Sequence, residues 1–259
     1  MVFRNLLAKE LRQLRWIAII GLLLSAGLAV VMVAAFRYVT QIVDELPPEL
    51  FEILARYDAA REFMTIFGNY SLYVWSQWNA KNLYQFGSMM VIIIAAVQFA
   101  GEVSKKTMGF YLTRPITRNQ GFLAKCAAAA LLLLVVVCGG IFFIWLISHF
   151  LGYSVEWGRL VVATVVTFTW LMVFYLLSAI ISILSREPVP AGVIAGISGM
   201  ALSLPGLFAP IRQFSIFYQM RAIEYFIGGQ PPLLSLAASL VIIGLLFFIG
   251  MHLFRKRDF

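Results

Sequence analysis

The residues with the clearest chemical character lie in one polar segment, Gly101–Lys125, which separates two uncharged apolar runs. Its charged side chains are one acid and five bases, in the order Glu102, Lys105, Lys106, Arg114, Arg118 and Lys125. One interpretation of cations beside apolar runs is that they orient the chain in a membrane and do nothing else. The other is that they form a surface that contacts a second protein.

Two local signals predict how this segment folds. Residues 117–120, Thr-Arg-Asn-Gln, have the form of a capping box, so a helix begins there and continues into the next apolar run. Arg114 precedes Pro115, which disfavours helix at Arg114, so the segment breaks between residues 112 and 116. We expect a short helix around residues 102–111, then the break, and then the capped helix.

Elsewhere the chain carries few groups that could perform catalysis. It contains no HExxH or GxSxG motif, no Cys/His cluster with the spacing of metal ligands, and no Walker A sequence. His149 and His252 stand near the ends of different apolar runs, where isolated histidines are typically structural. We therefore expect a non-enzymatic chain that holds no cofactor or metal of its own.

The composition of the chain indicates that membrane-spanning helices position these residues. The chain is 62% hydrophobic and only 12% charged, whereas about a quarter of the residues are charged in soluble domains. Roughly 20 apolar residues cross a bilayer core. We predict an all-α, polytopic membrane protein, a single domain over residues 1–259, with six transmembrane helices free of Asp, Glu, Lys and Arg: residues 16–36, 84–101, 126–151, 160–184, 189–209 and 233–254.

The distribution of charge predicts the orientation of these spans. The side that holds both termini, residues 102–125 and residues 185–188 carries 13 Lys and Arg, against 7 on the other side. The positive-inside rule therefore makes both termini and the 102–125 loop cytoplasmic and residues 37–83 an extracellular loop. The net charge of +8 reflects this topology, so no nucleic-acid partner is expected.

The first 15 residues have an amphipathic pattern. Basic side chains lie mostly opposite apolar ones at helical spacing, which predicts an interfacial helix that contacts membrane lipid. The alternative is a basic flank that only orients the first span. The predicted apolar face consists of Phe3, Leu6, Leu7, Leu11 and Leu14.

The fifth apolar run contains a stripe of small residues, Gly192, Gly196 and Gly199 with Ala191 and Ala195, which lets helices approach closely. The run should break at Pro205-Gly206, near the outer surface. Residues 210–232 are then expected to dip into, or lie along, the outer interface before the last span.

Together, these features resemble an ABC-2 type permease, the membrane subunit of an ATP-binding-cassette exporter. In that family the loop after the second span shows an acid, a basic residue followed by Thr, a Leu, a Pro, an Arg and a closing Lys. The residues that match in order and in similar spacing are Glu102, Lys106, Thr107, Leu112, Pro115, Arg118 and Lys125.

The resemblance implies a prokaryotic cytoplasmic-membrane protein whose segment 102–111 is a coupling helix seated on a separate ATPase subunit, which binds ATP and Mg. Two copies of the chain would enclose the substrate path. The apolar spans suggest a hydrophobic or amphipathic cargo: a lipid, a drug or a peptide. The alternative is a non-transporting scaffold or sensor that uses the 37–83 loop. The implied docking residues are Glu102, Lys105, Lys106, Thr107, Leu112, Arg114, Pro115 and Arg118.

Overall fold

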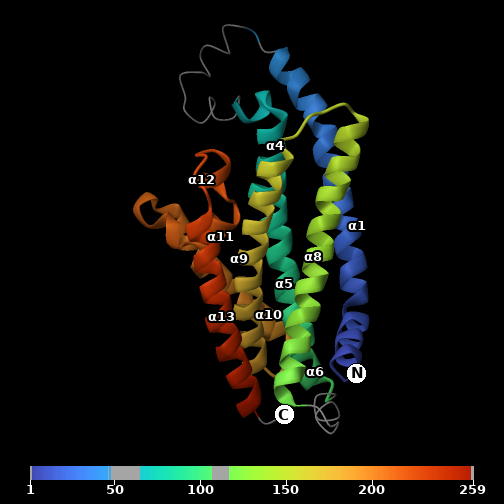
Figure 1. Cartoon of the computed structure of the whole chain (residues 1–259), viewed down its shortest axis with the longest axis vertical. Helices are drawn as coiled ribbons and strands as arrows, with labels where there is room; N and C mark the ends of the chain where they lie inside the picture. Colours follow the sequence, from blue (N-terminus) through green and yellow to red (C-terminus); the bar gives the residue numbers. More distant parts are fainter. Residues whose placement is uncertain (1, 46, 48–64, 107–116, 258–259) are drawn as a thin grey trace.

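A computed structural model describes residues 2–45, 47, 65–106 and 117–257 of the chain (Figure 1). All secondary structure in these ranges is helical. Both termini lie at one end of the bundle, called the terminal end below; the other is the opposite end. The prediction of an all-α protein with six candidate spans is confirmed, since six helices are long and apolar enough to cross a membrane: Phe3–Ile42, Tyr70–Ser104, Arg118–Phe150, Trp157–Leu184, Pro188–Leu207 and Leu233–Lys256.

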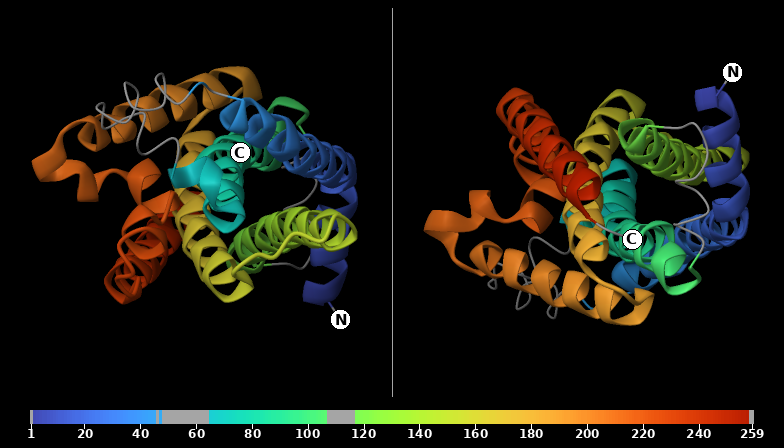
Figure 2. Two further views of the ribbon diagram at one scale, coloured as in Figure 1. Left: turned by 90° about the horizontal axis from the view of Figure 1, so that it is seen from above. Right: turned by 90° about the horizontal axis from the view of Figure 1, so that it is seen from below.

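The N-terminal segment is part of the first span. Helix α1 (Val2–Asp44) runs unbroken for 43 residues, about 64 Å at 1.5 Å per residue. Its buried residues recur every three or four positions and include Leu6, Glu10, Leu14, Ser25, Ala29 and Val33. This stripe packs along α8 (Arg118–Phe150), and Figure 2 shows the two helices side by side.

The prediction of a separate interfacial helix over residues 1–15 is therefore wrong. Nothing between residues 2 and 44 interrupts the helical hydrogen bonds, and protein rather than lipid covers part of the predicted apolar face. Leu6 and Leu14 are buried and Leu7 is half-buried, whereas Phe3 and Leu11 are exposed. Spacing alone identified an apolar face but could not say what covers it.

The second candidate span also starts earlier than predicted. Helix α4 (Tyr70–Gln77), a π-helical turn η1 (Trp78–Leu83) and α5 (Tyr84–Gln98) follow one another without a gap. Residues 37–44 and 70–83, predicted to be extracellular loop, thus belong to long helices. The remaining centre of that predicted loop lies mostly outside the described residues.

The π-helical turn re-aims two side chains into the bundle. The indole of Trp78 fills a notch at Gly140 of α8, where an added Cβ atom would lie 2.1 Å from the ring. The Asn79 amide nitrogen donates to the hydroxyls of Thr164 and Thr167, at 3.2 and 3.3 Å. These contacts join the second, third and fourth spans.

The six candidate spans are not equally buried. In the most apolar stretch of the second span, which includes α5, 67% of the residues are buried. The value for the fourth span, α9 (Trp157–Leu184), is 61%, so these two helices form the centre of the bundle. The corresponding shares for α10 (Pro188–Ser203) and α13 (Leu233–Lys256) are 17% and 11%, so these helices are peripheral (Figure 2).

Three of the five members of the predicted small-residue stripe of α10 are buried, namely Ala191, Ala195 and Gly199. Gly199 is buried, and an added Cβ would lie 2.7 Å from the ring of Phe174. Gly192 and Gly196 are only half-buried, and a Cβ on Gly196 would meet no atom of the described residues within 4 Å. The members of the stripe that face the bundle therefore recur every four residues.

Residues 204–232 turn back toward the bundle and are called the returning segment. The helix break predicted at Pro205-Gly206 is confirmed, because 3-10 turns Leu204–Leu207 and Ala209–Phe214 follow α10. Two short helices come next, α11 (Ile216–Met220) and α12 (Ile223–Phe226). Figure 1 shows α11 beside α9, below the opposite end of the bundle.

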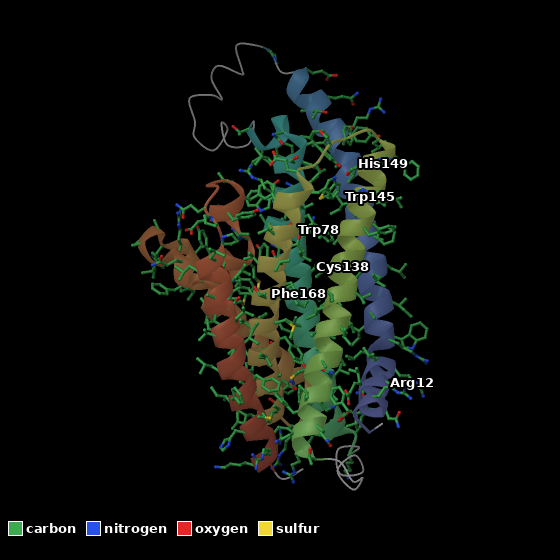
Figure 3. The ribbon with its side chains drawn as sticks, in the orientation of Figure 1. Arg12, Trp78, Cys138, Trp145, His149 and Phe168 are labelled. Carbon is green, nitrogen blue, oxygen red and sulfur yellow. The ribbon has the colours of Figure 1, made fainter. Side chains whose placement is uncertain are left out.

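Figure 3 places Arg12 near the terminal end and both Trp145 and His149 near the opposite end. The rings of Trp145 and His149 are stacked, with centroids 5.8 Å apart and an interplanar angle of 10°. This aromatic contact fits the structural role predicted for His149, since aromatic rings are favoured where a span leaves the hydrocarbon core.

Candidate functional site

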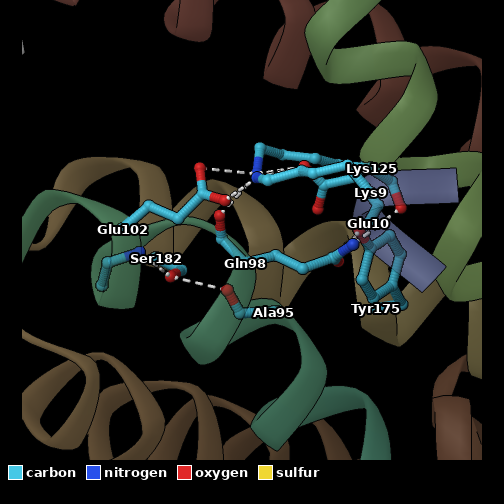
Figure 4. A network of polar contacts seen from close by, with 9 residues as sticks. Lys9, Glu10, Ala95, Gln98, Glu102, Lys125, Tyr175 and Ser182 are labelled. Carbon is cyan, nitrogen blue, oxygen red and sulfur yellow. Dashed lines mark hydrogen bonds and ion pairs between the residues drawn. The ribbon is translucent and has the colours of Figure 1, made fainter. Parts of the chain in front are cut away.

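A cluster of four charged side chains lies inside the bundle near the terminal end (Figure 4). Lys9 and Glu10 come from α1, Glu102 from the short helix α6 (Ala100–Ser104), and Lys125 from α8. Glu10 and Lys125 are fully buried, and Glu102 is only 3% exposed. We call these four residues the charge cluster. Its two cations and two anions balance.

Lys125 is the centre of the charge cluster. Its ammonium group donates to Glu102 Oε2 at 2.8 Å, to the Gln98 carbonyl oxygen at 2.9 Å and to Glu10 Oε1 at 3.1 Å. An ammonium group has three donors, so all of them are used. A buried charge is tolerated only when it is paired and hydrogen-bonded, and Lys125 meets both conditions.

Lys9 closes the cluster on its outer side. The Lys9 ammonium donates to Glu10 Oε1 at 2.9 Å and also to Glu102 Oε1, and 42% of its side chain remains exposed. The other carboxylate oxygen of Glu10, Oε2, is buried and has no hydrogen-bond partner among the described residues. The cluster thus binds α1, α6 and α8 together.

Gln98 connects the charge cluster to α9. Its amide nitrogen donates to the Lys125 carbonyl oxygen at 3.0 Å, and its amide oxygen accepts from the Tyr175 hydroxyl at 2.8 Å. Gln98 and Tyr175 are both fully buried. Hydrogen bonds therefore join α1, α5, α6, α8 and α9 near the terminal end.

The orientation of α6 depends on Ser182 of α9. The second span is distorted at Phe99 (φ −110°, ψ −71°), between α5 and α6. At this point the Ser182 hydroxyl donates to the Ala95 carbonyl oxygen at 2.9 Å and accepts from the Ala100 N–H at 3.0 Å. Ser182 thereby satisfies backbone groups at the distortion and fixes the direction in which α6 presents Glu102.

The structure brings together only some of the predicted docking residues. Glu102 is buried in the charge cluster, so a direct docking contact by its carboxylate is corrected to an internal role. Arg118 donates to the carbonyl oxygens of Arg255 and Arg257, at 2.6 and 2.7 Å, and thus holds the end of α13. Both side chains therefore bond other parts of this chain, which their residue types alone do not reveal.

The remaining predicted docking residues are exposed or undescribed. Lys105 and Lys106 are exposed and form a turn in which Lys106 has φ 54°. The predicted helix over residues 102–111 therefore ends early, since α6 stops at Ser104. Thr107, Leu112, Arg114 and Pro115 lie outside the described residues.

The predicted capping box is confirmed. The Thr117 hydroxyl accepts from the Gln120 backbone N–H, and the Gln120 side chain accepts from the Thr117 N–H. This pair starts α8 next to the charge cluster. The segment from Lys105 to Thr117 therefore begins and ends on helices that the cluster joins.

The terminal end is further closed by the C-terminal tail. Arg257 donates to the Ser185 carbonyl oxygen at 3.0 Å, next to the turn between α9 and α10. Burial and the nearby Arg186 lower the pKa of Arg257. Together with Arg118, this contact fixes the end of α13 to the rest of the bundle.

Sequence reasoning missed most of this site. Lys9 and Glu10 were assigned to a surface helix, and Gln98, Tyr175 and Ser182 had no assigned role. The available signals were an acid within the otherwise basic N-terminal segment and a glutamine inside an apolar run. In the described part of the chain, no three His, Cys, Asp or Glu side chains are grouped so that they could hold a metal ion.

Comparison with known proteins gives the chain a family. The model of a family described as "Protein of unknown function (DUF2705)" matches residues 30–259. The chain belongs to the DUF2705 family. No curated protein matches it. The match to DUF2705 includes Glu102 and Lys125 but not Lys9 and Glu10, so the charge cluster combines matched residues with residues that precede the match.

Proposed function

We propose that this DUF2705 protein is the membrane-spanning permease subunit of an ATP-binding-cassette exporter, driven by a separate ATPase subunit. In this proposal two copies of the chain enclose the substrate path, and ATP and Mg are bound by the partner. Six candidate spans and the resemblance of the 102–125 segment to ABC-2 type permeases support it.

The observation that carries the proposal is the place of the charge cluster relative to that segment. Lys105 and Lys106 are exposed beside Glu102, and Thr117 begins the helix that carries Lys125. A partner that displaced this segment would therefore act directly on α1, α6 and α8. Interfaces of this kind transmit motion as rigid-body displacement of packed helices.

In this mechanism the residues have different roles. Exposed Lys105 and Lys106, with Thr107, Leu112, Arg114 and Pro115, contact the ATPase. The charge cluster lies behind them and transmits the movement, because its ion pairs join three helices. Arg118 connects the same region to the last span.

The proposed orientation places the terminal end in the cytoplasm. Exposed or half-buried cations gather there, among them Arg4, Arg12, Arg186, Arg255 and Lys256. The positive-inside rule favours the cytoplasmic side for such a surface. An ATPase subunit would then meet the exposed lysines without crossing the membrane.

The proposal is tested by purifying the tagged chain from its native membrane in a mild detergent and identifying co-purified proteins by mass spectrometry. We expect a protein with a Walker A motif to be recovered with the wild-type chain and lost with Lys105→Glu/Lys106→Glu. The matched control is Arg37→Glu/Arg159→Glu, which makes the same change of charge at exposed sites outside the proposed docking surface.

If the wild-type chain elutes without such a protein, the exporter proposal fails. The scaffold or sensor function, based on the 37–83 region, then takes its place. If the control variant loses the partner as fully as the lysine variant does, docking through Lys105 and Lys106 is wrong.

A further inference from the structure

A charged side chain from the returning segment lies deep beside the candidate spans. Met220, which precedes Arg221, accepts a 2.7 Å hydrogen bond at its carbonyl oxygen from Thr167 of α9. At 1.5 Å per residue, Thr167 lies about 15 Å along a helix about 42 Å long. If α9 is centred on a bilayer core of roughly 30 Å, this level is about 9 Å inside the hydrocarbon.

Arg221 is held in place from several sides. Its carbonyl oxygen accepts from the indole N–H of Trp75 at 3.1 Å. Its guanidinium donates to the Tyr84 hydroxyl at 3.0 Å and lies 5.0 Å from the centre of that ring. The backbone turns sharply immediately afterwards, since Ala222 has φ 52°. The guanidinium is thus fixed beside α5.

This guanidinium has no anionic partner within the described chain. No carboxylate of the described residues forms an ion pair with Arg221, and its Nε atom is buried without a hydrogen-bond partner among them. The nearest acid in sequence, Glu224, faces the Arg212 guanidinium at 3.9 Å and accepts from the Tyr218 hydroxyl at 3.2 Å. An arginine at membrane depth is costly unless its charge is compensated, and such residues mark functional sites.

Arg221 lines a cavity of about 540 Å³ between α5, α9, α10 and the returning segment. The polar groups of this cavity are Tyr84, Gln85, Ser88, Ser203, Ser215, Tyr218 and Arg221. The remaining wall is mostly apolar and includes Ile92, Phe174, Met200 and Leu207. Met200 and Leu207 are 73% and 77% exposed, so the cavity opens at the surface of the bundle.

We propose that this cavity binds an anionic amphiphile, with its carboxylate or phosphate at Arg221 and its apolar chain along α5 and α10. A bidentate anion would complete the hydrogen bonding of the guanidinium, which presents a planar fork of donors. The apolar wall and the open space at Gly196 favour a ligand with a hydrocarbon chain over a bare anion. The site stands on this geometry alone and does not require the proposed exporter function.

The test is equilibrium binding of radiolabelled palmitate to the purified full chain in a nonionic detergent, by scintillation proximity. We expect one saturable site, from which dodecyl phosphate displaces palmitate and palmityl alcohol does not. Arg221→Gln should weaken binding roughly 10- to 100-fold, the loss typical of a hydrogen bond to a charged group. Arg221→Lys, which keeps the charge, should lose less. The control Arg212→Gln changes an exposed arginine of the same segment and should bind as the wild type does.

A second pair of variants keeps Arg221 intact, so it remains informative if Arg221→Gln misfolds. Gly196→Leu places a side chain in the open space of the cavity and should weaken palmitate binding. Gly244→Leu is the control, because a Cβ at Gly244 of α13 also meets no atom within 4 Å and Gly244 does not line the cavity.

Several results would overturn the assignment. Wild-type affinity in Arg221→Gln would exclude the guanidinium as the anion site. Equal competition by palmityl alcohol would show that only the apolar chain is recognised. Displacement by acetate or inorganic phosphate at the concentrations needed for palmitate, with Gly196→Leu unaffected, would indicate a bare anion site. Absence of saturable binding, with a changed oligomeric state in Arg221→Gln, would indicate that a second copy of the chain covers the cavity.

Discussion

Replacing Lys125 with methionine is expected to destabilise the bundle strongly. Methionine has a similar length and volume but cannot donate the three hydrogen bonds of the Lys125 ammonium. The buried carboxylates of Glu10 and Glu102 would then share one half-exposed partner, Lys9. Removing one member of a buried ion pair costs about 3–5 kcal/mol. We expect a loss of this size in the free energy of unfolding, measured by reversible unfolding in mixed detergent micelles.

A double variant separates loss of charge balance from loss of packing. Lys125→Met with Glu10→Gln leaves one cation, Lys9, and one anion, Glu102. It is expected to recover stability relative to the sum of the two single variants, with a coupling energy of about 1–3 kcal/mol. The control Lys105→Met removes an exposed lysine and should change stability by no more than about 0.5 kcal/mol. A Lys125→Met protein as stable as this control, or strict additivity in the double variant, would refute the reasoning.

Three further variants test other contacts in the same unfolding assay. Ser182→Ala should cost about 1–3 kcal/mol, because it leaves a buried N–H at the α5–α6 distortion unpaired. The control Ser198→Ala removes an exposed hydroxyl and should be near neutral. Equal effects of the two variants would contradict the role of Ser182 at the distortion. Gly140→Ala should cost about 1–3 kcal/mol, because its methyl group would overlap the packed indole ring of Trp78. The control Gly244→Ala has open space and should be neutral or slightly stabilising. A stable Gly140→Ala protein would show that the ring moves away easily. Thr117→Ala should cost about 0.5–2 kcal/mol by removing one half of the capping box, and no change would mean that packing alone starts α8.

The all-helical class and the six candidate spans could be predicted from sequence because six long apolar runs leave few alternatives. Their ends could not. Hydropathy reports which residues suit a bilayer core, whereas a helix continues as long as backbone hydrogen bonds and packing allow. Helix α1 therefore extends through the polar N-terminal residues, and the second span begins at Tyr70 rather than at residue 84.

The site was less predictable, because its charges pair over long separations in sequence. Lys125 was taken as the closing residue of a loop, but its partner Glu10 lies 115 positions away. A lysine next to an apolar run typically marks the end of a span, and only the approach of α1 to α8 shows that this one is buried. In the same way, Arg221 was expected in a segment that dips into, or lies along, the outer interface, and only the folded returning segment shows that it reaches the level of Thr167.

The local turn chemistry was predicted more successfully than the long-range contacts. Both the capping box at Thr117 and the break at Pro205-Gly206 depend on adjacent residues, so the sequence contains the whole signal. The small-residue stripe of α10 was identified by residue type, which does not show which of its members face the bundle. Ala191 and Ala195 pack with Gly199, while Gly192 and Gly196 lie off the buried face.

We propose that an ATPase drives this chain through exposed Lys105 and Lys106, which lie next to the charge cluster. Mg-dependent ATP hydrolysis by material purified on the tagged chain, compared between wild type and Lys105→Glu/Lys106→Glu, tests this directly. We expect hydrolysis with the wild type, loss of hydrolysis with the lysine variant, and wild-type hydrolysis with Arg37→Glu/Arg159→Glu. A wild-type preparation that hydrolyses no ATP would contradict the proposed drive by an ATPase.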